Sequence, residues 1–187
     1  LFTANLLQSQ EAHRRWRKMN QIRNDKFDLV LPEVMRENNI DMWIITNREG
    51  NFDPLYPDMG AGYVNSTGYY VFTDQGEGRI ERAALGISGY LLKEGGAYDY
   101  FGSELELREY VTERDPQRIG LNYSKNIGGA DGLSYSSHLE LAEILGETYT
   151  QRFVSAEKLV SDFRSRRVAS EIAVFGEACE ISYQIAE

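Results

Sequence analysis

The stretch that decides the fold is KFDLVLPEVMRENNIDMWIITNRE, residues 26–49. Its first half places apolar side chains on one face of an amphipathic helix, at Phe27, Leu31, Val34 and Met35. Pro32 lies inside this pattern, and an interior proline costs a helix about 3 kcal/mol. We therefore expect a kink there, or a second helix that carries Pro32 in its first turn. Asn38 and Asn39 are suited to the left-handed conformation of a helix C-terminal cap.

The second half of the stretch predicts a buried strand. DMWIIT, residues 41–46, is short, apolar and β-branched. The following NREGNFDPLYPDMGAG, residues 47–62, is rich in Pro, Gly, Asn and Asp and predicts a loop. Two further strand-like runs, 67–74 and 79–87, flank a Gly-rich turn and predict a β-hairpin. The segment GGAYDYFG, which ends at residue 102, reads as irregular.

Helices and strands alternate in the rest of the chain. Two capping boxes are predicted to open helices, the first at Ser103 and Glu106 and the second at Ser137 and Glu140. Gly146 is expected to end the second of these helices. Short strands are predicted at 118–123 and 151–155, and a helix at 156–164. This order predicts an α/β fold, with a mixed sheet of about five or six strands flanked by helices.

Both ends of the chain read as helical. Residues 1–23 form a polar lead-in in which Ser9 is a candidate N-cap. The last helix is expected to begin near Val168, and its apolar face includes Val168, Ile172, Phe175, Cys179 and Ala186. Cys179, the only cysteine, is expected to be a small buried hydrophobe on this face. No helix terminator follows the pattern, so the helix either runs out at a natural terminus or leads into a further segment.

Composition excludes several classes of partner. The 187 residues are 42% hydrophobic and 26% charged, with a formal net charge of −9. This charge repels a nucleic-acid backbone, and no run of eighteen apolar residues predicts a membrane span. We therefore expect neither a nucleic-acid nor a membrane partner. The chain begins at Leu1, so the compartment stays open between cytoplasmic and, if a signal peptide preceded Leu1, exported.

Candidate functional residues lie where the first predicted strand ends. The sequence marks no catalytic residue and no metal ligand, since its two histidines lie in separate segments. The loop 47–54 leaves the C-terminal end of a central strand, where α/β sheets place ligand contacts. Four of its side chains are candidates to hold a polar ligand or to rim another domain's cleft: Arg48, Glu49, Asn51 and Asp53. The alternative is a polar surface loop in which Asp53 begins a turn.

Short sequence motifs within these segments resemble those of the N-terminal domain of the creatinase/prolidase family, which includes the Xaa-Pro aminopeptidases. In that family a helix ends in a phrase of the type "mr..giD" and runs into a strand. The matching residues here are Arg36, Ile40, Asp41, Trp43 and Ile44, followed by Arg48-Glu49 and Asp53-Pro54. The family's linker into its catalytic domain is matched by Leu159, Phe163, Arg164, Glu171-Ile172, Ala178 and Ile181. Arg167 stands where the family often has Lys, and Gly176-Glu177 departs from its wording.

The resemblance implies a division of the chain and a role for it. It predicts a helical lead-in at 1–23, a creatinase/prolidase-type N-terminal domain at 24–165, and at 166–187 a linker and the first helix of a catalytic domain. The chain would then be the non-catalytic part of an Xaa-Pro aminopeptidase or prolidase, serving subunit association and shaping the substrate pocket.

The family also implies a cofactor and partners. Two divalent ions (Mn, Co or Zn) are expected in the catalytic domain and none in this segment. The expected partners are that catalytic domain, a peptide substrate in the parent enzyme, and further copies in a homodimer or homotetramer. Three alternatives stay open: a creatinase-like amidinohydrolase, a catalytically dead interaction module, and, outside the family, a stand-alone α/β domain that binds a small molecule.

Overall fold

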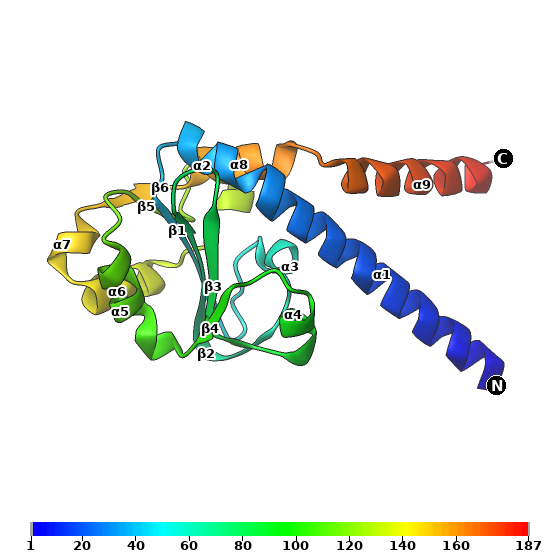
Figure 1. Cartoon of the computed structure of the whole chain (residues 1–187), viewed down its shortest axis with the longest axis horizontal. Helices are drawn as coiled ribbons and strands as arrows, with labels where there is room; N and C mark the ends of the chain where they lie inside the picture. Colours follow the sequence, from blue (N-terminus) through cyan, green and yellow to red (C-terminus); the bar gives the residue numbers. More distant parts are fainter. Residues whose placement is uncertain (1, 187) are drawn as a thin grey trace.

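The computed structural model describes residues 2–186, with side chains described from residue 10 onward. An α/β body carries two long helices that project from it on the same side and diverge toward the chain ends (Figure 1). The helices are α1 Phe2–Leu29, α2 Leu31–Glu37, α3 Tyr56–Met59, α4 Tyr90–Glu94, α5 Leu107–Arg114, α6 Tyr135–Leu145, α7 Glu147–Thr150, α8 Glu157–Ser165 and α9 Ala169–Ala186, with 3-10 turns η1 Glu104–Glu106 and η2 Gly128–Ala130. The strands are β1 Met42–Arg48, β2 Tyr63–Asp74, β3 Ile80–Ser88, β4 Tyr100–Gly102, β5 Ile119–Leu121 and β6 Phe153–Ser155.

The six strands form one mixed sheet in the order β4-β3-β2-β1-β5-β6. β2 pairs antiparallel with both β1 and β3, whereas the β3–β4, β1–β5 and β5–β6 pairs are parallel. β1 is central, with Ile44 opposite Val71 on one side and Leu121 on the other. The predicted α/β class and mixed sheet are confirmed.

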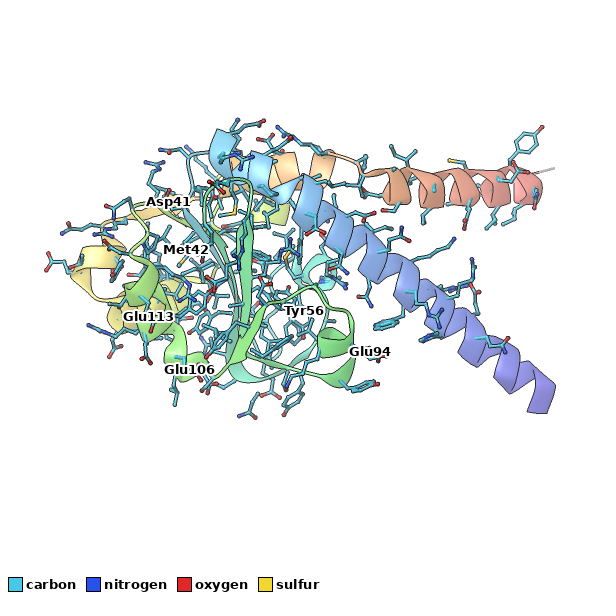
Figure 2. The ribbon with its side chains drawn as sticks, viewed as in Figure 1. Asp41, Met42, Tyr56, Glu94, Glu106 and Glu113 are labelled. Carbon is cyan, nitrogen blue, oxygen red and sulfur yellow. The ribbon has the colours of Figure 1, made fainter. Side chains whose placement is uncertain are left out.

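Alternate residues of β1 enter two separate cores, as the two-residue period of a strand requires. Trp43 and Ile45 face a core built with α1, α2, α3 and α8, while Met42 and Ile44 face a core built with α5 and α6. In Figure 2, Tyr56 lies on the first side of the sheet and Glu113, at the end of α5, lies on the other. Both faces of the sheet are thus covered, which explains why β1 is apolar along most of its length.

The proline in the deciding stretch acts as predicted. α1 ends at Leu29 and α2 begins at Leu31, so Pro32 lies in the first turn of a new helix. Asn39 follows α2 with a φ of 52°, the left-handed conformation expected at this helix end. Asp41 then fixes the start of β1, because its Oδ2 accepts from the backbone N–H groups of Gln117 and Arg118, each at 2.9 Å.

The first capping box is confirmed and the second is wrong. Ser103 and Glu106 cap each other's backbone N–H groups at the start of η1, which leads into α5. The second helix begins earlier than predicted: Ser134 is its N-cap and accepts from the backbone N–H of Ser137 at 3.1 Å. Ser137 is therefore inside α6, where it is buried, and is not the cap.

Three further expectations are corrected. α1 runs without interruption through Ser9, so Ser9 is not an N-cap. The segment read as irregular contains the edge strand β4, which the parallel pairing of Tyr100 with Ala83 holds in place. Cys179 is exposed and not buried, because no residue of α9 is buried by the described part of the chain.

Candidate functional site

The loop after β1 begins with a tight turn. The backbone N–H of Asn51 donates to the carbonyl of Arg48 at 3.0 Å, and the N–H of Arg48 donates back to Asn51 at 3.3 Å. Gly50 has a φ of 75°, which a residue without a Cβ adopts at little cost. The N–H of Glu49 donates to the carbonyl of Ser66 in β2, so this strand also holds the turn. The turn directs the side chains of Glu49 and Asn51 to the surface.

Behind this turn lies a cluster of buried polar side chains. The Trp43 Nε1–H donates to Asn122 Oδ1 at 2.7 Å, and Asn122 Nδ2 donates to Asp53 Oδ2 at 2.9 Å. Asp53 Oδ1 accepts from the N–H of Leu55 at 2.8 Å, and Asn47 Oδ1 accepts from the N–H of Asp53 at 3.1 Å. Asn47, Asp53 and Asn122 are each at most 2% exposed. The cluster therefore joins the loop that follows β1 to the C-terminal ends of β1 and β5.

Burial dominates the electrostatics of this cluster. Desolvation raises the pKa of Asp53, while hydrogen bonds from the Leu55 N–H and Asn122 and the nearby Arg164 lower it in part. Both carboxylate oxygens of Asp53 already accept hydrogen bonds within the chain. Gly132 closes the cluster from outside, because a Cβ at that position would lie 2.0 Å from Asp53 Oδ2. The arrangement fixes the loop and leaves Asp53 inside the protein.

The four residues predicted to rim a pocket fall into two groups. Arg48 Nη1 donates to Ser136 Oγ at 3.3 Å, which brings the end of β1 against the first turn of α6. Glu49 and Asn51 are exposed beside it, whereas Asp53 is buried. Three of the four thus lie at the surface above the C-terminal end of β1, and the fourth holds their loop from below.

Sequence reasoning missed Trp43, Asn122 and Gly132 as parts of this region. Asn122 comes directly after β5, and parallel neighbouring strands bring their C-terminal ends to the same sheet edge. This rule is enough to pair Asn122 with the loop after β1 once the two strands are known to be neighbours. No sequence signal identified Gly132, whose close contact with Asp53 depends on tertiary structure.

A second surface feature is the outer part of α9. Its large apolar side chains lie open to solvent, with Ile172, Phe175, Ile181 and Tyr183 each at least half exposed. Among residues 2–186, no group of three or more His, Cys, Asp or Glu is placed to hold a metal ion. In the same residues, no helix is long and apolar enough to cross a membrane.

This geometry defines an α/β domain with a helix-covered mixed sheet and an uncovered C-terminal helix. No protein-family model and no curated protein matches the sequence. Among solved structures, the chain is similar to an Xaa-Pro dipeptidase from Bacillus anthracis, with a TM-score of 0.50 and 18% sequence identity. The match covers 84% of this chain and 39% of that dipeptidase. At this identity the likeness shows the fold, and the predicted prolidase-like N-terminal domain is confirmed at that level.

Proposed function

We propose that the chain is the non-catalytic N-terminal domain of a dinuclear-metal exopeptidase of the Xaa-Pro aminopeptidase or prolidase type. The observation that carries the proposal is the shared fold with part of an Xaa-Pro dipeptidase, over 84% of this chain. The short motifs at residues 36–54 and 159–181 support it, because they match the family's sequence at the two ends of the resemblance. In this proposal residues 24–165 are the domain, preceded by a helical lead-in at 1–23 and followed by a linker and first catalytic-domain helix at 166–187.

The apolar face of α9 supports a second body beside this domain. A solvent-facing helix normally turns its apolar stripe toward a core. Ile172 and Phe175 are 58% and 50% exposed and Cys179 is exposed, although the three follow the helical spacing of the predicted apolar face. We infer that the catalytic body covers this face. The proposal places both divalent ions, Mn, Co or Zn, on that body, where they would activate the water that attacks the peptide bond.

The surface at the end of β1 supplies the pocket-shaping part of the proposal. Arg48, Glu49 and Asn51 are the proposed rim residues, since they are exposed or half-buried on a turn held by backbone hydrogen bonds. Asp53 is proposed to act indirectly, by fixing that turn through its bond to Asn122. The same domain is proposed to make the subunit contacts of a homodimer or homotetramer.

The proposal is tested by a substrate panel on the complete gene product and on residues 1–187 alone. Each protein is incubated with Mn²⁺, Co²⁺ or Zn²⁺ and with an Xaa-Pro dipeptide, a longer Xaa-Pro peptide and creatine. We expect metal-dependent cleavage of an Xaa-Pro bond by the complete product and no turnover by residues 1–187. An Ala-for-Pro peptide is the matched substrate control.

Each other outcome has a definite meaning. Turnover of creatine alone would replace the peptidase with an amidinohydrolase of the same architecture. No turnover by a complete product would favour an interaction module. Metal-dependent cleavage by residues 1–187 alone would contradict the proposal, as would a complete product that ends at residue 187.

A further inference from the structure

α9 leaves the body beside α1, and polar contacts join the two helices there. Ser170 Oγ donates to Asp25 Oδ2 at 2.5 Å, and Lys26 Nζ lies 3.6 Å from Glu171 Oε2. These two contacts involve consecutive residues on each helix, Asp25-Lys26 and Ser170-Glu171. The first turn of α9 is thereby fixed to the last turns of α1.

The ion pair in this joint is largely removed from water. The side chains of Lys26 and Glu171 are 11% and 14% exposed. The Lys26 ammonium also lies 5.0 Å from the centre of the Phe163 ring, in a cation–π arrangement. Arg167 pairs with the second oxygen of Glu171, so this carboxylate lies between two cations. Burial lowers the pKa of Lys26 and the neighbouring Glu171 charge opposes that shift.

Beyond the joint the helices separate, and little else holds α9. A groove of about 430 Å³ opens between them, with apolar walls that include Met19, Ile22, Val174 and Phe175. One further contact spans it: Lys18 Nζ lies 2.5 Å from Glu177 Oε2, with side chains 31% and 56% exposed. Because both side chains are partly exposed to solvent, this pair contributes little to holding α9. No residue of α9 itself is buried. The described contacts therefore hold α9 mainly at its base, through these four side chains and the buried Val168 that directly precedes the helix.

We propose that Asp25, Lys26, Ser170 and Glu171 form a clamp that fixes the direction in which α9 leaves the α/β body. In this proposal α1 is the rigid support for α9, and its C-terminal end is held in the body by the fully buried Phe27. The four residues are positioning residues: they act on a partner only through α9. That α9 leads to a catalytic body rests on the proposed function, whereas the clamp is a property of residues 2–186.

The clamp is tested by distance measurement within residues 1–187. Cys179 is exposed on α9 and is the only cysteine, so it takes one spin label. A second label is attached at Glu94→Cys on α4, whose exposed position at the edge of the body is labelled in Figure 2. Pulsed electron paramagnetic resonance then reports the distance from the body to α9. We expect a single narrow distribution.

Two substitutions of Lys26 test the role of its charge: one removes the charge and the other keeps it. Lys26→Met keeps an unbranched side chain of nearly the same length and loses the ammonium, and it is expected to abolish the narrow peak. Lys26→Arg keeps the cation and should retain the peak. Lys18→Met, at the exposed pair, is the matched control and should leave the distribution unchanged. Glu171→Gln tests the same contact from α9, should Lys26→Met lower the melting temperature of the body.

The clamp is overturned by a broad distribution in the unsubstituted pair, or by an unchanged narrow peak in both Lys26→Met and Glu171→Gln. Neither result depends on hydrolysis. The proposed function therefore fails or survives by its own substrate panel, independently of the clamp.

Discussion

Replacing Trp43 with alanine is expected to lower the free energy of unfolding by about 3–5 kcal/mol, the usual cost of removing a large buried aromatic side chain. The indole is fully buried on the central strand. Its ring centroid lies 5.4 Å from that of Phe72 and 5.9 Å from that of Phe163. Its loss also leaves Asn122 Oδ1 without the donor at 2.7 Å. The change is measured by urea unfolding followed by far-ultraviolet circular dichroism.

Trp16 is the matched control, because it is the other of the chain's two tryptophans and lies half-buried on α1 outside both cores. It stacks only on the neighbouring His13 ring among the aromatic contacts of the described side chains. Trp16→Ala is expected to cost less than about 1 kcal/mol. Equal losses in the two variants would show that β1 is not the centre of the fold.

Replacing Gly132 with alanine is expected to cost about 1–3 kcal/mol, the range for forcing extra atoms into a packed site. The added methyl group would meet Asp53 Oδ2 at 2.0 Å, Asp53 Cγ at 2.5 Å and Pro54 Cδ at 2.7 Å. Asp53 cannot retreat without breaking its bonds from Leu55 and Asn122. The variant should therefore both lower stability and release the loop that carries the proposed rim residues.

Gly128→Ala is the control for this experiment, since Gly128 lies in the same connection and has no heavy atom within 4 Å of a built Cβ. Its free energy of unfolding should change by less than about 1 kcal/mol. Amide hydrogen exchange at residues 49–52 provides the second readout. It should accelerate in Gly132→Ala and stay unchanged in Gly128→Ala, and no difference between the variants would refute the packing of Gly132 on Asp53.

Much of the sheet could be predicted because its central elements carry strong local signals. DMWIIT is apolar throughout, and the hairpin is marked by its Gly-rich turn. Edge strand β4 has no such signal: Tyr100–Gly102 is three residues long and is held by parallel pairing with a distant strand. The predicted start of α6 is wrong because serines at 134, 136 and 137 all suit an N-cap, and only the backbone geometry selects Ser134.

The place of the loop after β1 could be predicted from the sequence, but the burial of Asp53 could not. The loop after β1 was found because it follows a central strand, and Arg48, Glu49 and Asn51 lie near the surface there. The burial of Asp53 requires Asn122, which is 69 residues away in sequence. An aspartate before a proline in a polar loop carries no local sign of such a partner.

The predicted helical period of α9 is likewise confirmed, but of the described residues on the predicted face only Val168, just before the helix, is buried. Ile172, Phe175 and Cys179 lie on a helix with no buried residue. An amphipathic pattern predicts that one face of a helix will be buried, but it does not identify the segment that buries it. The proposed function assigns that role to the catalytic body.

The most direct test of that assignment is the reaction rate of the Cys179 thiol with a small disulfide reagent. The rate is measured in residues 1–187 and in the complete gene product, with any other cysteine replaced by serine and the rate of a free thiol as reference. The proposal predicts fast reaction in residues 1–187, where Cys179 is exposed. In the complete product it predicts a rate at least about tenfold lower, a protection of about 1.4 kcal/mol. Equal rates in the two proteins would show that no second body covers this face of α9, and would contradict the proposal.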